Sequence, residues 1–157
     1  MRVGWGCDVH RFGGRGRTLL AGVEVDAGRG VEATSDGDVL AHAAADALLG
    51  AAALGDLGVL FPSDDPRWRG ADSMALLAEV AARVAAAGYR VSSLDATVIA
   101  ERVRVAPHRE AIRTRLAGVL GVEAGAVSIK ATSTDGLGFL GRDEGLAAVV
   151  VAVLVER

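Results

Sequence analysis

The sequence predicts an α/β (α+β) domain of about five strands and three helices. Apolar residues recur at helical spacing in three segments, and short apolar or alternating runs lie between these segments. Of the 157 residues, 51% are hydrophobic and 24% are charged, which is typical of a globular chain with one core. We therefore expect a single domain over residues 1–157 that folds without a disulfide.

Strands and a long helix are expected in the first half of the chain. Residues 2–6 and 18–25 are short apolar runs that predict strands. Turn and capping residues at 34–38 introduce a helix predicted over about residues 38–54. Residues 55–70 contain two prolines and three aspartates, so we expect an irregular loop, and loops of that length are usually functional or disordered.

The second half continues the alternation of helices and strands. A helix is expected from a cap near Asp72 or Ser73 to Gly88, followed by a strand over residues 94–100. Pro107 fits the first turn of a third helix, which Gly121 ends. Two further strands are predicted near residues 126–132 and 145–155.

The last predicted strand is apolar on both of its faces. Its two sets of alternating residues are Leu146, Ala148, Val150, Ala152 and Leu154, and Ala147, Val149, Val151, Val153 and Val155. A strand with helices on one side and water on the other would alternate, so the second face must also be covered. Helices of the same chain are one possible cover. With three helices predicted, we favour another subunit.

Charge and cysteine content bear on partners and location. Twenty acidic and 17 basic side chains give a net charge of −3, which argues against a nucleic-acid partner and, on charge alone, against anionic ligands. The longest apolar run, residues 146–155, is far below the roughly 20 residues that span a bilayer, so we expect no membrane partner. The N-terminus lacks a signal-peptide pattern, and a single cysteine agrees with a cytoplasmic location.

Asp8 and His10 are the first candidate metal ligands. They are one residue apart just after a predicted strand, so extended geometry would place both side chains on one side. Carboxylate and neutral imidazole both bind zinc, and catalytic zinc sites typically have three protein ligands. A strand-end aspartate beside a surface histidine is the commoner arrangement, so the pair needs a third ligand. His42, one turn into the predicted helix, is the candidate.

His42 belongs to a polar stripe with Asp38 and Asp46, each four residues apart on the predicted helix. Such a stripe is normally a solvated face. The alternative is that Asp46 accepts the proton of the non-ligating nitrogen of His42 and orients the ring. His108 has no acidic neighbour at metal-binding spacing, which favours a structural role.

Two turn clusters are candidate phosphate sites. Ser35 and the amides around Gly37 precede a helix, where free N–H groups attract anions. Residues 132–135 follow a strand and offer hydroxyls and a carboxylate, a set that suits phosphate with a hard cation such as magnesium. Each cluster is also consistent with an ordinary helix cap or turn that binds no ligand. The sequence has no P-loop, G-x-S-x-G or Rossmann motif.

Several motifs, spread over nearly the whole chain, together carry a family resemblance. They are Gly6-Cys7-Asp8-Val9-His10, Ser35-Asp36-Gly37-Asp38, His42, residues 46–58, Leu60-Phe61-Pro62 and Gly138-Phe139. This set resembles the 2-C-methyl-D-erythritol 2,4-cyclodiphosphate synthase family. The resemblance implies conversion of 4-diphosphocytidyl-2-C-methyl-D-erythritol 2-phosphate to the cyclic diphosphate with release of CMP, in the non-mevalonate isoprenoid pathway. It also implies a mixed β-sheet with helices packed on one face and the other face buried in a homotrimer. The active sites would lie between subunits, in agreement with the doubly apolar strand.

The resemblance further implies cofactors and site residues. Asp8, His10 and His42 would hold one zinc ion per subunit, and Asp135 would lie near a second divalent cation, magnesium or manganese. Thr34 and Ser133 would stand at the two catalytic positions. The implied substrate-binding positions are Asp8, Val9, His10, Thr34, Ser35, Asp56, Leu57, Gly58, Phe61, Pro62, Ser63, Asp64, Asp65, Ala100, Glu101, Arg102, Val103, Arg104, Val105, Ala106, Thr132, Ser133, Thr134, Asp135, Phe139 and Arg142.

Five positions depart from the pattern of that family. Thr34 stands where a histidine is usual, and it donates a neutral hydrogen bond but carries no positive charge. Ser133 replaces a threonine and keeps the hydroxyl, whereas Asp135 replaces a glutamate and is one carbon shorter. Val103 and Arg104 replace a Pro-Lys pair, which retains the cation and removes the rigid residue. We expect an active enzyme despite these changes.

Three residues fall where that family lines a cavity on the trimer axis, proposed to bind an isoprenoid diphosphate. They are Phe139, Arg142 and Glu144. The alternative, which we slightly favour, is that Arg142 and Glu144 form an ion pair that holds the subunits together.

Two other functions remain open on the sequence. A metal-dependent phosphohydrolase would use the same zinc ligands to activate water. A non-catalytic trimeric binding module would use the histidines and aspartates structurally.

Overall fold

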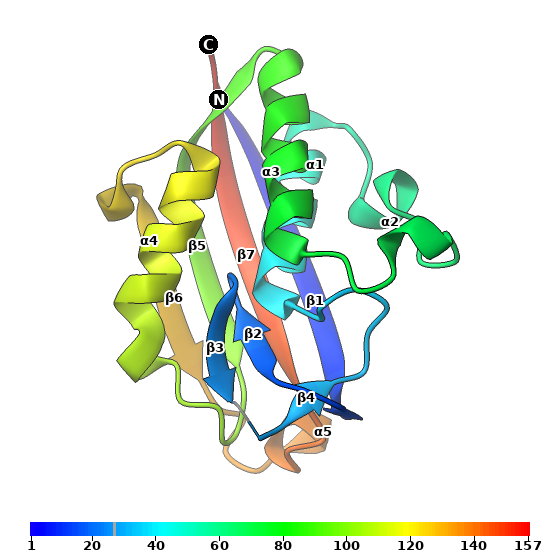
Figure 1. Cartoon of the computed structure of the whole chain (residues 1–157). Coiled ribbons are helices and arrows are strands. Elements are labelled where there is room, and N and C mark those ends of the chain that lie inside the picture. The colour runs from blue at the N-terminus through cyan, green and yellow to red at the C-terminus, as the bar shows by residue number, and fades with distance from the viewer. Residues whose placement is uncertain (27) are drawn as a thin grey trace.

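Helices pack against one face of a mixed sheet in the computed structural model, which describes residues 1–26 and 28–157 (Figure 1). Within these residues the main sheet has the strand order β4-β1-β7-β5-β6. Its strands are β1 (Arg2–Gly14), β4 (Gly30–Val31), β5 (Tyr89–Ile99), β6 (Val127–Thr132) and β7 (Gly145–Glu156). The β5–β6 pair is parallel and the other pairs are antiparallel, so the predicted mixed sheet is confirmed.

The three long helices lie on the same face of this sheet (Figure 1). They are α1 (Val39–Ala52), α3 (Ser73–Ala86) and α4 (Arg109–Leu120), close to the predicted bounds. The shorter elements are the hairpin β2 (Thr18–Leu20) and β3 (Val23–Asp26), the helices α2 (Leu57–Leu60) and α5 (Gly138–Gly141), and the 3₁₀ turns η1 (Pro66–Trp68), η2 (Ala106–His108) and η3 (Ala124–Ala126). No helix in the described part of the chain combines the length and hydropathy that a membrane crossing requires.

Several predicted bounds were wrong. Strand β1 continues to Gly14, so Asp8 and His10 lie inside the strand, in register with Ala148 and Leu146 of β7. The strand predicted over residues 18–25 is two strands, because the chain turns at Ala21 and Gly22 with positive φ angles of 50° and 70°. Strand β5 begins earlier than predicted, at Tyr89.

The irregular loop expected over residues 55–70 contains two short helical elements, α2 and η1. The aspartates that suggested a loop act as caps. The Asp56 carboxylate accepts the Val59 N–H at the start of α2, and Asp65 accepts the Arg67 N–H at the start of η1. Pro66 occupies the first turn of η1, where a missing N–H costs nothing.

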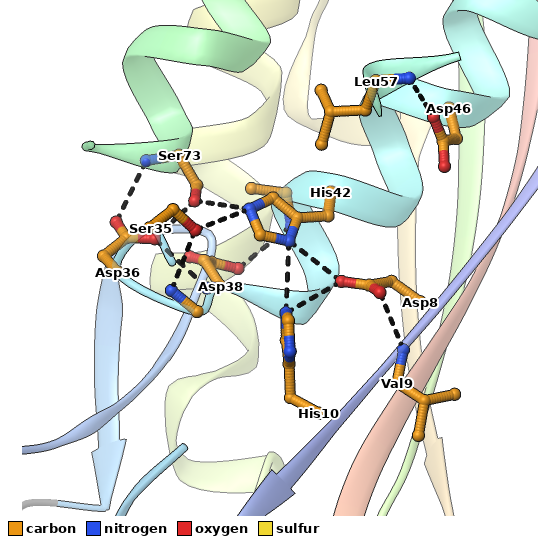
Figure 2. Close-up of polar contacts among 12 residues, drawn as sticks. Asp8, Val9, His10, Ser35, Asp36, Asp38, His42, Asp46, Leu57 and Ser73 are labelled. Atoms are coloured by element: carbon orange, nitrogen blue, oxygen red, sulfur yellow. Dashed lines mark hydrogen bonds and ion pairs between the residues drawn. The ribbon is translucent and has the colours of Figure 1, made fainter. Parts of the chain in front are cut away.

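Helix α1 lies directly against β1 because the facing residues are small. A Cβ atom added to Gly4 would lie 1.9 Å from the carbonyl oxygen of Ala47, and one added to Gly6 would lie 2.1 Å from that of Ala43. Glycine on the strand and alanine on the helix therefore permit a separation that larger side chains would forbid. Side chains alternate between the two faces of a strand, so Asp8 and His10 lie on the same face of β1 as Gly4 and Gly6 and point toward this helix (Figure 2).

The N-cap of α1, Asp38, is fully buried and anchors the helix to the β2–β3 turn. Its carboxylate accepts the Ala41 N–H of the helix at 3.0 Å and the N–H groups of Ala21 and Gly22 at 2.9 and 2.6 Å. Burial raises the pKa of Asp38, and these backbone donors oppose that rise. Asp38 is therefore a buried structural cap, and the usual interpretation of such a stripe as a solvated face does not apply to it.

The sheet face opposite the long helices carries apolar side chains from β1 and β7. On β1, the side chains of Val3 and Trp5 are 62% and 63% exposed. On β7, Val149, Val151 and Val153 are partly buried, whereas the helix-facing residues of the same strand are fully buried. That a second subunit covers this face of the sheet stays a prediction.

We expect Gly6→Ala to destabilise the fold, because the new methyl group would overlap backbone atoms of α1. The expected loss is about 3 kcal/mol in the free energy of unfolding, measured by urea denaturation. Gly50→Ala is the matched control on α1, since no atom lies within 4 Å of its added Cβ. Equal stability of the two variants would contradict the close-contact interpretation.

Candidate metal centre

Asp8 and His10 of β1 meet His42 of α1 at the helix-facing side of the sheet (Figure 2). One carboxylate oxygen of Asp8 lies 3.0 Å from Nε2 of His10 and 2.9 Å from Nδ1 of His42. The two ring nitrogens are 3.2 Å apart. Three ligand atoms from two elements thus converge on one point, as the sequence led us to expect.

These three atoms fit a tetrahedral metal site. With bonds of about 2.0–2.1 Å, ligands of tetrahedral zinc are roughly 3.3 Å apart, close to the separations above. All three side chains are partly buried, and His10 and His42 line a cavity from which a further ligand could reach the ion. Among the described residues, Asp8, His10 and His42 form a group of histidines and carboxylates that could hold a metal ion.

Asp8 and His42 shift each other's pKa in opposite directions. Burial by itself would raise the pKa of Asp8, but hydrogen bonds and charge from His10 and His42 hold it well below its usual range. Burial by itself would lower the pKa of His42, but the hydrogen bond to Asp8 and the charges of Asp8, Asp38 and Asp36 raise it above 6.5. The Asp8 carboxylate is ready to bind a cation, whereas the raised pKa of His42 means that a proton competes with a cation for this ring.

The outer nitrogen of His42 contacts two serines. Nε2 lies 2.8 Å from Oγ of Ser73 and 3.1 Å from Oγ of Ser35. The predicted role of Asp46 is wrong, because its carboxylate accepts the Leu57 N–H at 2.7 Å and so holds the start of α2 (Figure 2). Ser73 was missed as a functional residue. It is 31 residues from His42, and in the sequence it reads only as a helix cap.

A cavity of about 390 Å³, the metal-side cavity, opens beside the metal-ligand group of Asp8, His10 and His42. It gathers many of the predicted substrate-binding residues, and its lining comprises His10, Ala33, Thr34, Ser35, His42, Leu57, Gly58, Phe61, Pro62, Ser63, Asp64, Trp68 and Leu76. Four predicted positions from the same part of the chain lie outside this lining. Asp8 is one of them and is itself a candidate metal ligand. Asp56 and Asp65 cap α2 and η1, and the side chain of Val9 points away from the two ligands that flank it (Figure 2).

A second cavity, of about 300 Å³, gathers the predicted nucleotide segments between β5, β6 and η2. It is lined by Val98, Ala100, Val103, Arg104, Val105, Ala106, Arg109, Ala131, Thr132 and Ser133. The backbone N–H of Ala100 donates to the carbonyl of Thr132 at 3.1 Å and joins the two segments. The linings of the two cavities share no described residue, so one chain does not bring the two halves of the predicted site together.

The remaining predicted positions lie outside both cavity linings. Asp135 is exposed, and its carboxylate accepts the Ser133 hydroxyl at 3.2 Å. Arg102 lies 3.6 Å from Asp143, and Arg142 donates to Glu144 at 2.6 Å in an exposed ion pair. The predicted positions Glu101 and Thr134 lie in the β5–η2 and β6–α5 connections, whereas the exposed Phe139 lies in α5.

Comparison with known proteins defines the class first. Residues 1–155 match the YgbB family, and the chain belongs to this family. A curated relative from Pseudomonas aeruginosa is 53% identical over 157 residues, all of both chains. That relative is named 2-C-methyl-D-erythritol 2,4-cyclodiphosphate synthase. The resemblance seen in the sequence motifs is thereby confirmed.

Solved structures agree with this assignment. The bifunctional IspDF of Campylobacter jejuni has a TM-score of 0.97 at 39% identity, over 99% of this chain and 42% of that one. A 2C-methyl-D-erythritol-2,4-cyclodiphosphate synthase in a CDP-bound form has a TM-score of 0.89 at 33% identity, over 98% of this chain and all of the other.

We expect metal binding to expel a proton from His42. Because its pKa is raised, the metal-free ring is mostly protonated at pH 6.5, and only the neutral ring binds metal. Metal affinity should therefore fall as the pH drops below the pKa of His42. An NMR titration should place this pKa above 6.5 in the metal-free protein and lower it in Asp8→Asn, with Asp65→Asn as the control. A midpoint below 6.5 in the unaltered protein would refute this expectation.

Proposed function

We propose that this protein converts 4-diphosphocytidyl-2-C-methyl-D-erythritol 2-phosphate to 2-C-methyl-D-erythritol 2,4-cyclodiphosphate and CMP. The observation that carries the proposal is the convergence of Asp8, His10 and His42 at the edge of a cavity lined by the predicted substrate residues. Full-length similarity to proteins named for this reaction supports it. We place the enzyme in the cytoplasm, where the pathway would supply its substrate.

The chemical step is an intramolecular phosphoryl transfer. An oxygen of the 2-phosphate forms a bond to the β-phosphorus, the bond from that phosphorus to the CMP oxygen breaks, and CMP leaves with the electron pair. The difficulty is the repulsion between two polyanionic groups. Zinc held by Asp8, His10 and His42 would supply positive charge and Lewis-acid polarisation.

The protein itself supplies position and hydrogen bonds. In the metal-side cavity, Ser35 and Thr34 place hydroxyl groups beside the ligands, where they would contact phosphate oxygens. In the second cavity, Ser133 and Arg104 would contact the diphosphate and the nucleotide. A second cation, magnesium or manganese, would lie near Asp135. Holding the reacting groups together replaces an encounter with a unimolecular step.

We propose a homotrimer in which the metal-side cavity of one subunit faces the nucleotide cavity of its neighbour. Two observations support it: the two linings are separate within one chain, and the sheet face away from the helices is apolar. The exposed Arg142–Glu144 pair would then lie near the trimer axis. We favour a role for it in holding subunits over binding of an isoprenoid diphosphate.

Product analysis tests the proposed reaction. With zinc and magnesium present, the protein should turn the cytidylyl substrate into a cyclic diphosphate, detected by ³¹P NMR. His42→Ala should lose about 100-fold or more in rate, because it removes a metal ligand. His108→Ala is the control, since His108 belongs to neither cavity lining. Linear phosphate products would favour the phosphohydrolase, and no turnover with zinc bound would favour the binding module.

The oligomeric state tests the proposed assembly. Sedimentation of the unaltered protein should give three times the 16.0 kDa mass of one chain. Val151→Asp, on the outer face of β7, should dissociate the assembly because a carboxylate would be buried in an apolar contact. Ala82→Asp introduces the same charge on the exposed side of α3, on the helix side of the sheet, and should leave the mass unchanged. A monomeric unaltered protein would exclude the homotrimer.

A further inference from the structure

The hydroxyl of Ser73 lies between His42 and a carboxylate that is not a metal ligand. Ser73 is 1% exposed at the first residue of α3, and its Oγ is 2.8 Å from Nε2 of His42. The same hydroxyl bonds to one carboxylate oxygen of Asp36, and the Ser73 N–H donates to the other at 3.0 Å (Figure 2). Asp36 is thereby held by both polar groups of Ser73.

The direction of these hydrogen bonds follows from the donors available. A carboxylate only accepts, so the single hydroxyl proton of Ser73 points to Asp36. Toward His42 the Ser73 oxygen can then only accept, which requires the proton of the neutral ring to be on Nε2. Nδ1 is left with a free lone pair. Nδ1 is the atom that lies 2.9 Å from Asp8 and 3.2 Å from His10.

We propose that Asp36 and Ser73 form a positioning relay that fixes the ring orientation and tautomer of His42 for metal binding. It does the work that we had expected of Asp46, with a hydroxyl placed between carboxylate and imidazole. The inference rests on the metal site of the proposed function. Ser73 and Asp36 are positioning residues, because they act through His42.

The relay also determines what Ser35 does. Ser35 Oγ accepts the Gly37 N–H at 3.2 Å and lies 3.1 Å from Nε2 of His42, farther than Ser73 does. With the Nε2 proton directed to Ser73, the hydroxyl proton of Ser35 stays available to a ligand in the metal-side cavity. One buried serine thus leaves the other free to donate to phosphate.

A purely structural role for Ser73 makes a different prediction. Ser73 begins α3, so its replacement could act by loosening that helix end. Asp72 provides the matched control, because its carboxylate caps the same helix by accepting the Met74 N–H at 2.9 Å, and its own bond is to the backbone of α3. Asp72→Ala should weaken α3 and leave His42 undisturbed.

The test measures zinc affinity by competition with a chromophoric chelator, using zinc and no substrate. Ser73→Ala and Asp36→Asn should weaken zinc binding by about 10–100-fold, as is typical when a partner behind a histidine ligand is lost. Asp72→Ala should bind zinc as the unaltered protein does. Ser73→Thr, which restores a hydroxyl, should recover most of the lost affinity.

A spectroscopic readout accompanies the affinities. In the zinc-loaded protein, the His42 ring should show a proton on Nε2 that is protected from solvent exchange, and Ser73→Ala should remove this protection. Unchanged affinity and protection in Ser73→Ala would overturn the relay, as would an equal loss in Asp72→Ala. Neither readout uses the cytidylyl substrate, so a protein that binds zinc as described but forms no cyclic product would refute the proposed function and leave the relay standing.

Discussion

The close contact between α1 and β1 is the constraint on which the candidate site depends. Gly4 and Gly6 have no side chains, so the helix lies where any added Cβ would overlap the carbonyl oxygens of Ala47 and Ala43. The metal-ligand group bridges this contact, with two ligands on the strand and His42 on the helix. Moving α1 away from the sheet would therefore separate the ligands. Packing of the smallest residues in the chain fixes the ligand geometry before any ion binds.

Carboxylates around the start of α1 have three separate tasks, which explains how an acidic chain can accept phosphate. Asp38 is buried and accepts backbone N–H groups, Asp36 is engaged by Ser73, and Asp8 bonds to two histidines. None of the three presents unpaired charge to the metal-side cavity. A net charge of −3 led us to expect poor binding of anions, but the local field is set by these pairings and by the cation that Asp8 would hold.

Local signals in the sequence were enough to predict α1 and to single out Asp8, His10 and His42 as candidate metal ligands. Spacing placed Asp8 and His10 on one strand face and His42 in a capped helix, but the packing of α1 on β1 that brings them together is a tertiary contact. The partner of His42 was not predictable. Asp46 was at the right helical spacing, but Ser73 reaches the ring only because α3 packs beside α1, a tertiary contact that no local pattern encodes. Short capped helices such as α2 were also not predictable, since the sequence does not distinguish a capping aspartate from a loop aspartate.

Under the proposed function, the apolar sheet face matters for catalysis as well as for stability, because the two cavities of one chain are separate. In one chain, the candidate metal ligands and the predicted nucleotide segments open into different cavities. Assembly through β1 and β7 would pair the cavities of neighbouring copies. Under the proposed function, each copy contributes half of a site, and the strand that is apolar on both faces is what allows the halves to meet. The same residues that stabilise the assembly would then control whether the reacting phosphates are brought together.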